Sequence, residues 1–307
     1  MATIQTLDYI STVEVYPHTI DTGLGTEVSP YINADNTDGI QTMINTLAAG
    51  RGGCVMLGSF RYNITTQILI TTPSIKIQGT VAGYNIDPNA INEGISATSL
   101  ITAGSCISLA GVGYPGRPGA MFLSSLYLWG TTARQPIGTF AGTVGIALNS
   151  YIDQPTLQNI NIGGFDYGVK ATNIAPGFID FTYLHQVNIQ GTRIGAYYDG
   201  IVGTATAGQH YMCCCIAEQD EHNMYVTLAS TNSSFVIEGC AFYRGSSAAG
   251  VTTPANVYFG GNKSRFLGCE FCQAGHNLVL GTSVPADGMI LAGNYNSITS
   301  SQFLDNT

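Results

Sequence analysis

The sequence predicts an all-β fold, a right-handed parallel β-helix whose coils stack as a solenoid behind a short N-terminal capping helix. Three observations support this prediction. First, the 307 residues include 38 glycines but only 9% charged residues, a composition that favours turn-rich β structure over helices. Second, a three-residue motif recurs at intervals of 25 to 34 residues. Third, a glycine or asparagine follows several copies of this motif at a constant distance.

The recurring motif has two inward-facing residues on either side of an outward-facing one, as in a half-buried strand. Its copies lie at residues 126–128, 160–162, 187–189, 215–217, 240–242, 269–271 and 301–303. Because stacked coils place equivalent residues above one another, we expect Cys215, Cys240 and Cys269 to form one internal column. The cysteines are therefore predicted to be packed thiols rather than disulfides.

The marker after the motif lies six residues beyond its last member. It is found at Gly168, Gly195, Asn223 and Asn277. Glycine and asparagine tolerate a positive φ, so each marker is predicted to be a left-handed corner where the chain turns from one sheet to the next. Longer intervals to Gly145 and Asn256 predict loops at residues 131–142 and 245–253.

Strand alternation resumes beyond each corner, and the apolar parity is expected to face inward. The other parity places Lys170, Tyr197, Tyr225, Tyr258 and Val279 outward, one above another at the strand spacing of about 4.8 Å. Two interpretations of the three tyrosines stay open. A row of aromatic rings on a flat sheet suits the binding of sugar rings, and it equally suits a subunit interface.

The N-terminal region predicts a helix at residues 33–50, with Thr37 or Asp38 as its N-cap and Gly50 at its C-terminal turn. Its apolar stripe consists of Ile40, Met43, Ile44 and Leu47. Strands are expected at residues 54–57, 61–65, 67–71 and 74–78. Because the stripe must be covered, we expect the helix to close the open first coil of the solenoid.

Residues 33–41, 52–57 and 60–62 resemble the N-terminal segment of pectate-lyase-like β-helix proteins, which include bacteriophage tailspikes and bacterial polysaccharide lyases, hydrolases and epimerases. The similarity covers about residues 33–79. It departs from the family pattern at Asp35-Asn36, where an acidic pair is usual, and at Gly58, where a proline is usual. The resemblance implies the fold, but it does not fix the chemistry, because this family hosts many reactions and some members that only bind.

Several classes of partner are excluded by the composition. The net charge of −9 and the lack of clustered lysines and arginines argue against nucleic acid. Residues 1–16 lack a basic start followed by an apolar run, so no Sec signal is expected there. No segment approaches the roughly 20 apolar residues that cross a bilayer, so no membrane partner is expected.

The densest group of ionisable residues lies between the motif at 215–217 and its corner. Glu218, Asp220 and Glu221 cluster there, and Glu221 aligns with Arg193 and Asp166 in the preceding coils. Such a surface column offers the two carboxylates that glycosidases use as acid and as base or nucleophile. The alternative is a stacked salt bridge on an exposed turn, which contributes about 0 to 1 kcal/mol.

No cofactor is expected. His222 and His276 precede their corners in two coils, but no third metal ligand follows at a matching interval. Cys269 and Cys272 have C-x-x-C spacing, yet two residues three apart in a strand begin on opposite faces. Neither pair therefore predicts a zinc or redox site.

The resemblance, together with the lack of a Sec signal, the predicted thiols and the tyrosine row, implies a virion-associated, tailspike-like protein that is made in the host cytoplasm and recognises a bacterial surface polysaccharide. Whether it also cleaves the glycan, as a hydrolase or a lyase, stays open. One alternative is a non-catalytic structural fibre or adhesin of the same fold. A cellular polysaccharide lyase or epimerase is a third interpretation, less favoured because such enzymes normally carry export signals.

The resemblance also implies an organisation. Residues 1–32 are expected to attach the chain to other virion proteins, residues 33–79 to form the capping helix and first strands, and residues 80–307 to form the coils. The last motif, at residues 301–303, is followed by only four residues. An open coil there exposes apolar side chains and strand edges, so we expect a continuation of the chain or a neighbouring subunit of a homo-oligomer, a trimer by resemblance, to cover it.

Overall fold

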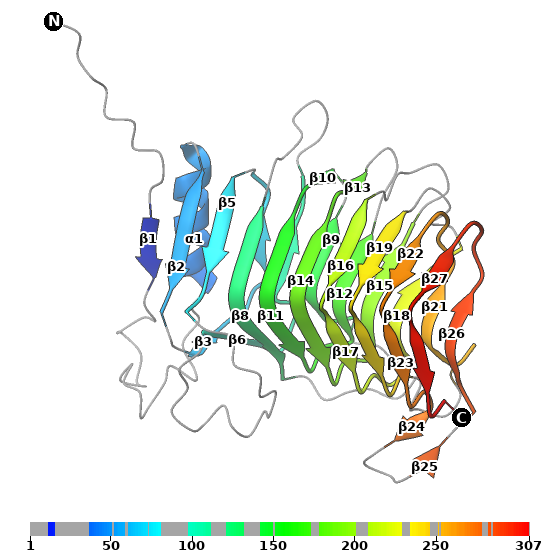
Figure 1. Cartoon of the computed structure of the whole chain (residues 1–307). Coiled ribbons are helices and arrows are strands. Elements are labelled where there is room, and N and C mark those ends of the chain that lie inside the picture. Colours follow the sequence, from blue (N-terminus) through cyan, green and yellow to red (C-terminus); the bar gives the residue numbers. More distant parts are fainter. Residues whose placement is uncertain are drawn as a thin grey trace, which may run out of the picture.

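The computed structural model describes residues 12–15, 37–50, 52–58, 61–72, 74–80, 98–111, 121–131, 142–149, 151–172, 178–200, 208–228, 234–245, 251, 253–277, 282–283 and 285–306. Two long parallel sheets run along one axis with the core between them (Figure 1). In this part of the chain the first sheet has 16 strands and the second has 8. The predicted parallel β-helix is therefore confirmed.

The first sheet, sheet 1, contains most of the strands. Its strands are β1 (Thr12–Val15), β2 (Gly53–Leu57), β3 (Arg61–Asn63), β5 (Ile75–Gln78), β6 (Ser99–Thr102), β8 (Phe122–Gly130), β11 (Thr156–Gly163), β14 (Tyr183–Gln190), β16 (Gln209–Met212), β17 (Cys215–Ala217), β19 (Phe235–Glu238), β20 (Ala241–Tyr243), β22 (Arg265–Leu267), β23 (Glu270–Cys272), β27 (Ser297–Thr299) and β28 (Gln302–Leu304). Parallel pairing links each coil to the next.

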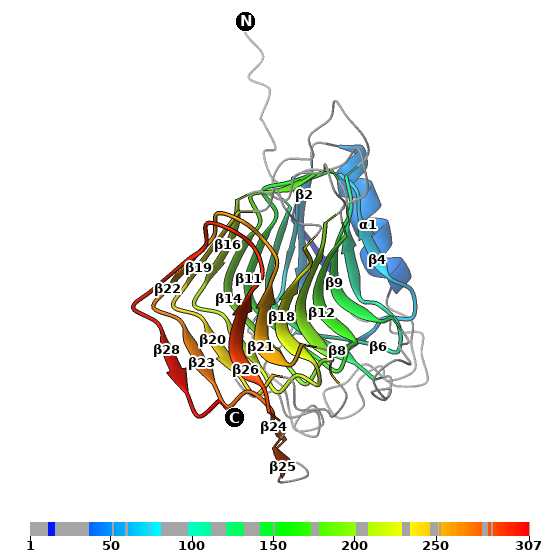
Figure 2. The same cartoon turned by 90° about the vertical axis from the view of Figure 1, so that its right-hand side faces the viewer.

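The second sheet, sheet 2, lies across the core from sheet 1, as the view along the axis shows (Figure 2). Its strands are β4 (Ile68–Ile70), β7 (Ile107–Leu109), β9 (Val144–Asn149), β12 (Tyr167–Thr172), β15 (Ile194–Asp199), β18 (His222–Val226), β21 (Ala255–Phe259) and β26 (Asp287–Leu291). Two short pairs complete the described strands: β10 (Ile152–Asp153) with β13 (Ile179–Asp180), and β24 (His276–Asn277) with β25 (Thr282–Ser283).

A bend divides sheet 1 into two halves. From β8 onward, one residue in each coil has a φ between 52° and 59° at this point: Ser125, Asn159, Gln186, Cys213, Gly239, Gly268 and Ser300. The long strands β8, β11 and β14 continue through the bend, whereas later coils break there into separate strands such as β16 and β17. The bend therefore gives the molecule two differently oriented faces on the same sheet.

The predicted cysteine column is wrong by one residue in one coil. Cys215 pairs with Asn188 and Ala241, which face outward, so the inward residue of that coil is Cys214. Cys214, Cys240 and Cys269 are each at most 2% exposed and belong to the main core. All eight cysteines are free, as predicted, and six of them are packed in the interior, whereas Cys213 is exposed and Cys215 is half-buried.

The prediction of left-handed corners is wrong, because none of the four markers, Gly168, Gly195, Asn223 and Asn277, has a positive φ. Gly168 and Gly195 are opposite each other in register. A Cβ on Gly195 would lie 2.3 Å from Ile216 Cγ2 and 2.5 Å from the carbonyl oxygen of Asn223. Glycine is present at this position because the neighbouring chain leaves no room for a side chain.

The asparagines at the same register form a short buried ladder. Asn223 donates from Nδ2 to Asn256 Oδ1 at 3.2 Å, and Asn256 donates to the carbonyl oxygens of Phe242 and Cys272. Their role is to satisfy backbone groups at the turn. Asn277 does not continue this ladder, because it lies in β24 of a hairpin, and Gly288 is the residue opposite Asn256.

The N-terminal helix α1 (Thr37–Ala49) begins at one of the two predicted N-caps. Ile40, Ile44 and Leu47 are buried in the main core and Met43 packs against it. Gly50 donates its N–H to the carbonyl oxygen of Leu47 at 3.1 Å, which ends the helix. Figure 1 shows α1 beside β2 at the first coils, and β1 pairs with the outer edge of β2.

Some predictions lie outside the described residues. These are most of the segment at 1–32, the two loops at 132–141 and 246–250, and the outward Val279 with its neighbours at 278–280.

Candidate functional site

The column predicted from Asp166, Arg193 and Glu221 exists in the backbone. Ile194 donates its N–H to the carbonyl oxygen of Asp166, and Glu221 donates its N–H to that of Arg193. The side chains, however, are turned inward rather than to the surface. Arg193 is 3% exposed and Glu221 is 14% exposed, and Arg193 Nε donates to Glu221 Oε1 at 2.7 Å. This ion pair is therefore enclosed within the turn and does not form the predicted surface site.

Asp166 has a different partner from the one its column suggests. Its carboxylate accepts hydrogen bonds from the backbone N–H of Thr143 at 3.0 Å and from the Thr143 hydroxyl at 3.4 Å. The Thr143 hydroxyl in turn accepts the N–H of Asp166 at 3.1 Å. Asp166 is only 6% exposed, so this reciprocal contact ties two coils together at the turn.

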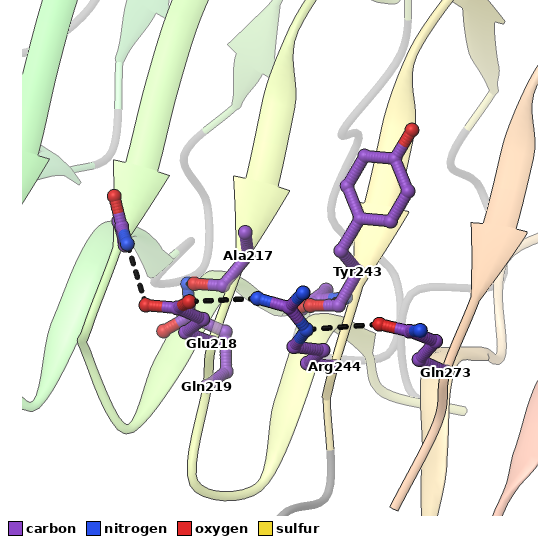
Figure 3. A network of polar contacts seen from close by, with 8 residues as sticks. Ala217, Glu218, Gln219, Tyr243, Arg244 and Gln273 are labelled. Carbon is purple, nitrogen blue, oxygen red and sulfur yellow. Dashed lines mark hydrogen bonds and ion pairs between the residues drawn. The ribbon is translucent and has the colours of Figure 1, made fainter. Parts of the chain in front are cut away.

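Glu218 is a predicted carboxylate that reaches the surface. It lies just after β17, at a φ of 59°, in a column of residues that all have a positive φ. Its side chain is 35% exposed and forms an ion pair with Arg244 Nη1 at 2.9 Å. The side chain of Arg244 is 30% exposed. Arg244 Nε then donates to Gln273 Oε1 at 2.9 Å, as Figure 3 shows.

The row extends one coil in the other direction as well. Gln190 Nε2 donates to the second carboxylate oxygen of Glu218 at 2.5 Å. Gln190, Glu218, Arg244 and Gln273 come from four successive coils, so the row runs along the axis of the solenoid. We call these four residues the polar row. It brings amide, carboxylate and guanidinium groups together on a half-exposed face.

The neighbours of Glu218 in sequence stabilise the turn. Gln219 is fully buried, accepts the N–H of Thr192 at 2.8 Å and donates to the carbonyl oxygen of Ala217 at 2.7 Å. Asp220 is half-buried, and its backbone N–H donates to the carbonyl oxygen of Thr192 at 3.3 Å. Glu218 and Glu221 are thus close in sequence but form ion pairs with different arginines, Arg244 and Arg193.

A further carboxylate, which the sequence did not single out, lies beside the polar row. Glu270 accepts a hydrogen bond from the Tyr243 hydroxyl at 2.5 Å and another from the Cys272 thiol at 3.2 Å. These two donors, the tyrosine foremost, lower the pKa of Glu270. Burial raises the pKa of Cys272 to about 12, with Glu270 adding to the effect, so Cys272 is a thiol at neutral pH.

The predicted row of outward tyrosines is confirmed in sheet 2. Tyr197, Tyr225 and Tyr258 are opposite one another, and Lys170 precedes them in register. The rings of Tyr197 and Tyr225 are 5.8 Å apart at 12°, and those of Tyr225 and Tyr258 are 4.7 Å apart at 15°. The faces of the central ring are therefore turned to its neighbours, and the row offers ring edges and hydroxyls to solvent.

His222 lies below this row and is only 2% exposed. Its Nδ1 lies 2.9 Å from the carbonyl oxygen of Ala255, which makes Nδ1 the protonated nitrogen of a neutral ring. Burial lowers the pKa of His222 to about 4. Among the described residues no group of three or more His, Cys, Asp and Glu side chains could hold a metal ion. Within the same residues, no helix is long and apolar enough to cross a membrane.

No protein-family model matches the chain, and the curated proteins include no similar sequence. Several solved structures are similar in fold. Open reading frame 18 of Geobacillus virus E2 has a TM-score of 0.58 and 16% identity, with 88% of this chain and 50% of that chain covered. A tailspike protein of Acinetobacter baumannii bacteriophage Fri1, a capsular polysaccharide depolymerase, has a TM-score of 0.55 and 14% identity, with 88% and 47% covered.

Tailspike protein 2 of bacteriophage CBA120 gives a TM-score of 0.50 and 15% identity, with 89% of this chain and 40% of that chain covered. The chain thus spans half or less of the length of these structures. At such identities the likeness concerns the fold. This chain has the right-handed parallel β-helix fold of phage tailspike proteins.

Proposed function

We propose that this chain is a virion-associated protein that recognises a bacterial surface polysaccharide. The observation that carries the proposal is the polar row, Gln190, Glu218, Arg244 and Gln273, which runs along the coil axis on a half-exposed face. Planar amide, carboxylate and guanidinium groups are the side chains that hydrogen-bond to hydroxyl groups with defined geometry. A row that repeats at the coil spacing suits a ligand that is itself a linear polymer.

Tailspike neighbours support the general kind of protein. One neighbour with the same fold is a capsular polysaccharide depolymerase of a phage. We extend the proposal to a homotrimer and to attachment through residues 1–32, both by resemblance to tailspikes. The stacked tyrosines Tyr197, Tyr225 and Tyr258 are proposed as a second contact with the polysaccharide, through their hydroxyls and edges, or as contacts between subunits.

Cleavage of the glycan is the finer part of the proposal. Among the predicted catalytic residues Glu218 and Asp220 are both partly exposed, and Glu218 is the one whose carboxylate belongs to the polar row. Asp166, Arg193 and Glu221 have structural partners that occupy them in the folded chain. We therefore propose Glu218 as the residue on which hydrolysis depends.

The alternative function, a structural fibre or adhesin, is favoured by one specific observation. The Arg193–Glu221 pair and the Asp166–Thr143 contact both link adjacent coils from inside the turn. Ionisable residues that hold coils together are consistent with a protein that binds without breaking bonds. Shortening of the polysaccharide during incubation with the protein would indicate hydrolysis, and binding without shortening would indicate the structural alternative.

The test uses the purified protein and a panel of capsular and O-antigen polysaccharides. Binding is measured by interferometry on immobilised polysaccharide, and the length of soluble polysaccharide after incubation is measured by size-exclusion chromatography. We expect at least one polysaccharide to bind, and Glu218→Gln to weaken that binding about tenfold, because it breaks the ion pair with Arg244. Glu238→Gln is the matched control, since Glu238 is an exposed carboxylate on the other half of sheet 1. A wild-type chain that binds none of the panel would contradict the proposal.

A further inference from the structure

Trp129, the single tryptophan of the chain, lies in sheet 1 in the same register column as Gln190 of the polar row, with Gly163 between them. It is half-buried at the end of β8, and it packs with Ile101 and Tyr127 in a small apolar cluster that is separate from the main core. The rings of Trp129 and Tyr127 are 6.3 Å apart at 22°. The indole is thus an outward aromatic group that is positioned by other side chains.

The next coil leaves room for this indole. Gly163 is opposite Trp129 in register, and a Cβ on Gly163 would lie 2.4 Å from Trp129 Cζ3 and 2.9 Å from Cε3. Any side chain at residue 163 would displace the ring. The ring therefore extends along the axis over Gly163. Gln190 lies one coil further on, opposite Gly163 in register.

We propose that Trp129 and the polar row form one saccharide-binding strip. The indole packs against the apolar face of one sugar unit, and Gln190, Glu218 and Arg244 hydrogen-bond to hydroxyls of the units that follow. Trp129 is three coils away from Glu218, which corresponds to about 14 Å at the strand spacing of about 4.8 Å. This inference rests on the proposed polysaccharide recognition and specifies its place and its ligand class.

The strip is suited to an uncharged glycan. Glu218 and Arg244 neutralise each other. Between Trp129 and Arg244 lies the half-buried amide of Asn188, which donates to the buried Asn161 Oδ1 at 3.0 Å. Beyond Arg244, Glu270 adds a carboxylate whose lowered pKa keeps it charged, which disfavours a polyanion.

The unmodified protein allows a direct test, because all tryptophan fluorescence comes from residue 129. Neutral O-antigen polysaccharides and uronate-containing capsular polysaccharides are titrated separately, and binding is measured in parallel by calorimetry. We expect a neutral polysaccharide to change the emission in a saturable way, with a midpoint that agrees with calorimetry. Binding without any change in emission would overturn the strip, and binding restricted to the uronate-containing polysaccharides would overturn the uncharged ligand class.

Variants provide the second measurement. Trp129→Ala is expected to weaken binding of the neutral polysaccharide about tenfold, and Tyr295→Ala, at an 86% exposed aromatic residue elsewhere, to leave it unchanged. Circular dichroism and thermal unfolding check that each variant folds, and Trp129→Leu, which fills the site without an aromatic face, replaces Trp129→Ala if the latter does not. Wild-type affinity in a folded Trp129 variant would overturn the inference while leaving polysaccharide recognition intact. A wild-type chain that binds none of the polysaccharides would overturn both.

Discussion

Arg193 and Glu221 form an ion pair across two adjacent coils, and both side chains are almost completely enclosed by protein. Removing one partner of a buried pair leaves the other charge without compensation, which costs about 3 to 5 kcal/mol. We therefore expect Glu221→Ala to lower the free energy of unfolding by this amount in urea titrations. Glu218→Ala, which breaks a half-exposed pair, is the matched control and is expected to cost no more than about 1 kcal/mol. Equal losses in the two variants would contradict this assignment.

His222 makes stability depend on pH. Burial lowers its pKa to about 4 in the folded chain, whereas an unfolded histidine has a pKa near about 6.5. Between these values only the unfolded chain binds the proton, so the free energy of unfolding falls as the pH drops from about 6.5 to about 4. The contribution lost over this window is roughly 3 kcal/mol.

The test compares urea unfolding at several pH values for the wild type and for His222→Asn, which keeps a side-chain donor for Ala255 but does not titrate. The difference between the two proteins should increase steadily above pH 4 and level off near pH 6.5. Parallel curves throughout this range would show that His222 is not the group responsible.

Close packing at Gly195 predicts a large effect from one added methyl group. A Cβ there would meet Ile216 and the backbone of Asn223, so Gly195→Ala is expected to destabilise the fold by about 1 to 3 kcal/mol. Gly104→Ala is the control, because its nearest neighbour, Thr102 Oγ1, is 3.8 Å away. Thermal unfolding of both variants measures the effect. A Gly195→Ala protein as stable as the wild type would contradict the prediction and would mean that the two coils can move apart to make room for the methyl group.

Cysteine reactivity distinguishes the register of the structure from the register predicted by the motif. Cys213 is exposed at the bend and Cys215 is half-buried, whereas Cys214 is enclosed in the core. Alkylation of the native chain, followed by peptide mass analysis, should label Cys213 first and leave Cys214 unlabelled until the protein unfolds. Cys213→Ser should remove the fast phase. Rapid labelling of Cys214 would support the other register.

The fold was predictable from the sequence because each coil repeats the same alternation of apolar residues. The slip at Cys215 arose because residues 213–215 are three identical small residues, so alternation alone cannot say which one faces inward. The hairpin of β24 and β25 caused a second error. Asn277 kept the expected interval, but the chain leaves the coil there and returns at β26.

The candidate site was less predictable than the fold. The alignment of Asp166, Arg193 and Glu221 followed from the coil length. Whether a side chain at a turn points inward or outward depends on the local φ values, which the spacing of the motifs does not reveal. Arg244 was not identified as the partner of Glu218, because the one-residue slip at Cys215 placed Tyr243 opposite Glu218, whereas the structure pairs Tyr243 with Ala217. The role of Trp129 depends on the missing side chain of Gly163, one coil away in space.

The bend in sheet 1 has a consequence for engineering. Its residues are as different as serine, asparagine, glutamine, cysteine and glycine, yet their φ values agree within a few degrees. The backbone therefore sets this position while the chemical identity of the side chain is largely free. Because adjacent coils are about 4.8 Å apart, labels or reactive groups substituted at these positions would be spaced along the axis in multiples of that distance.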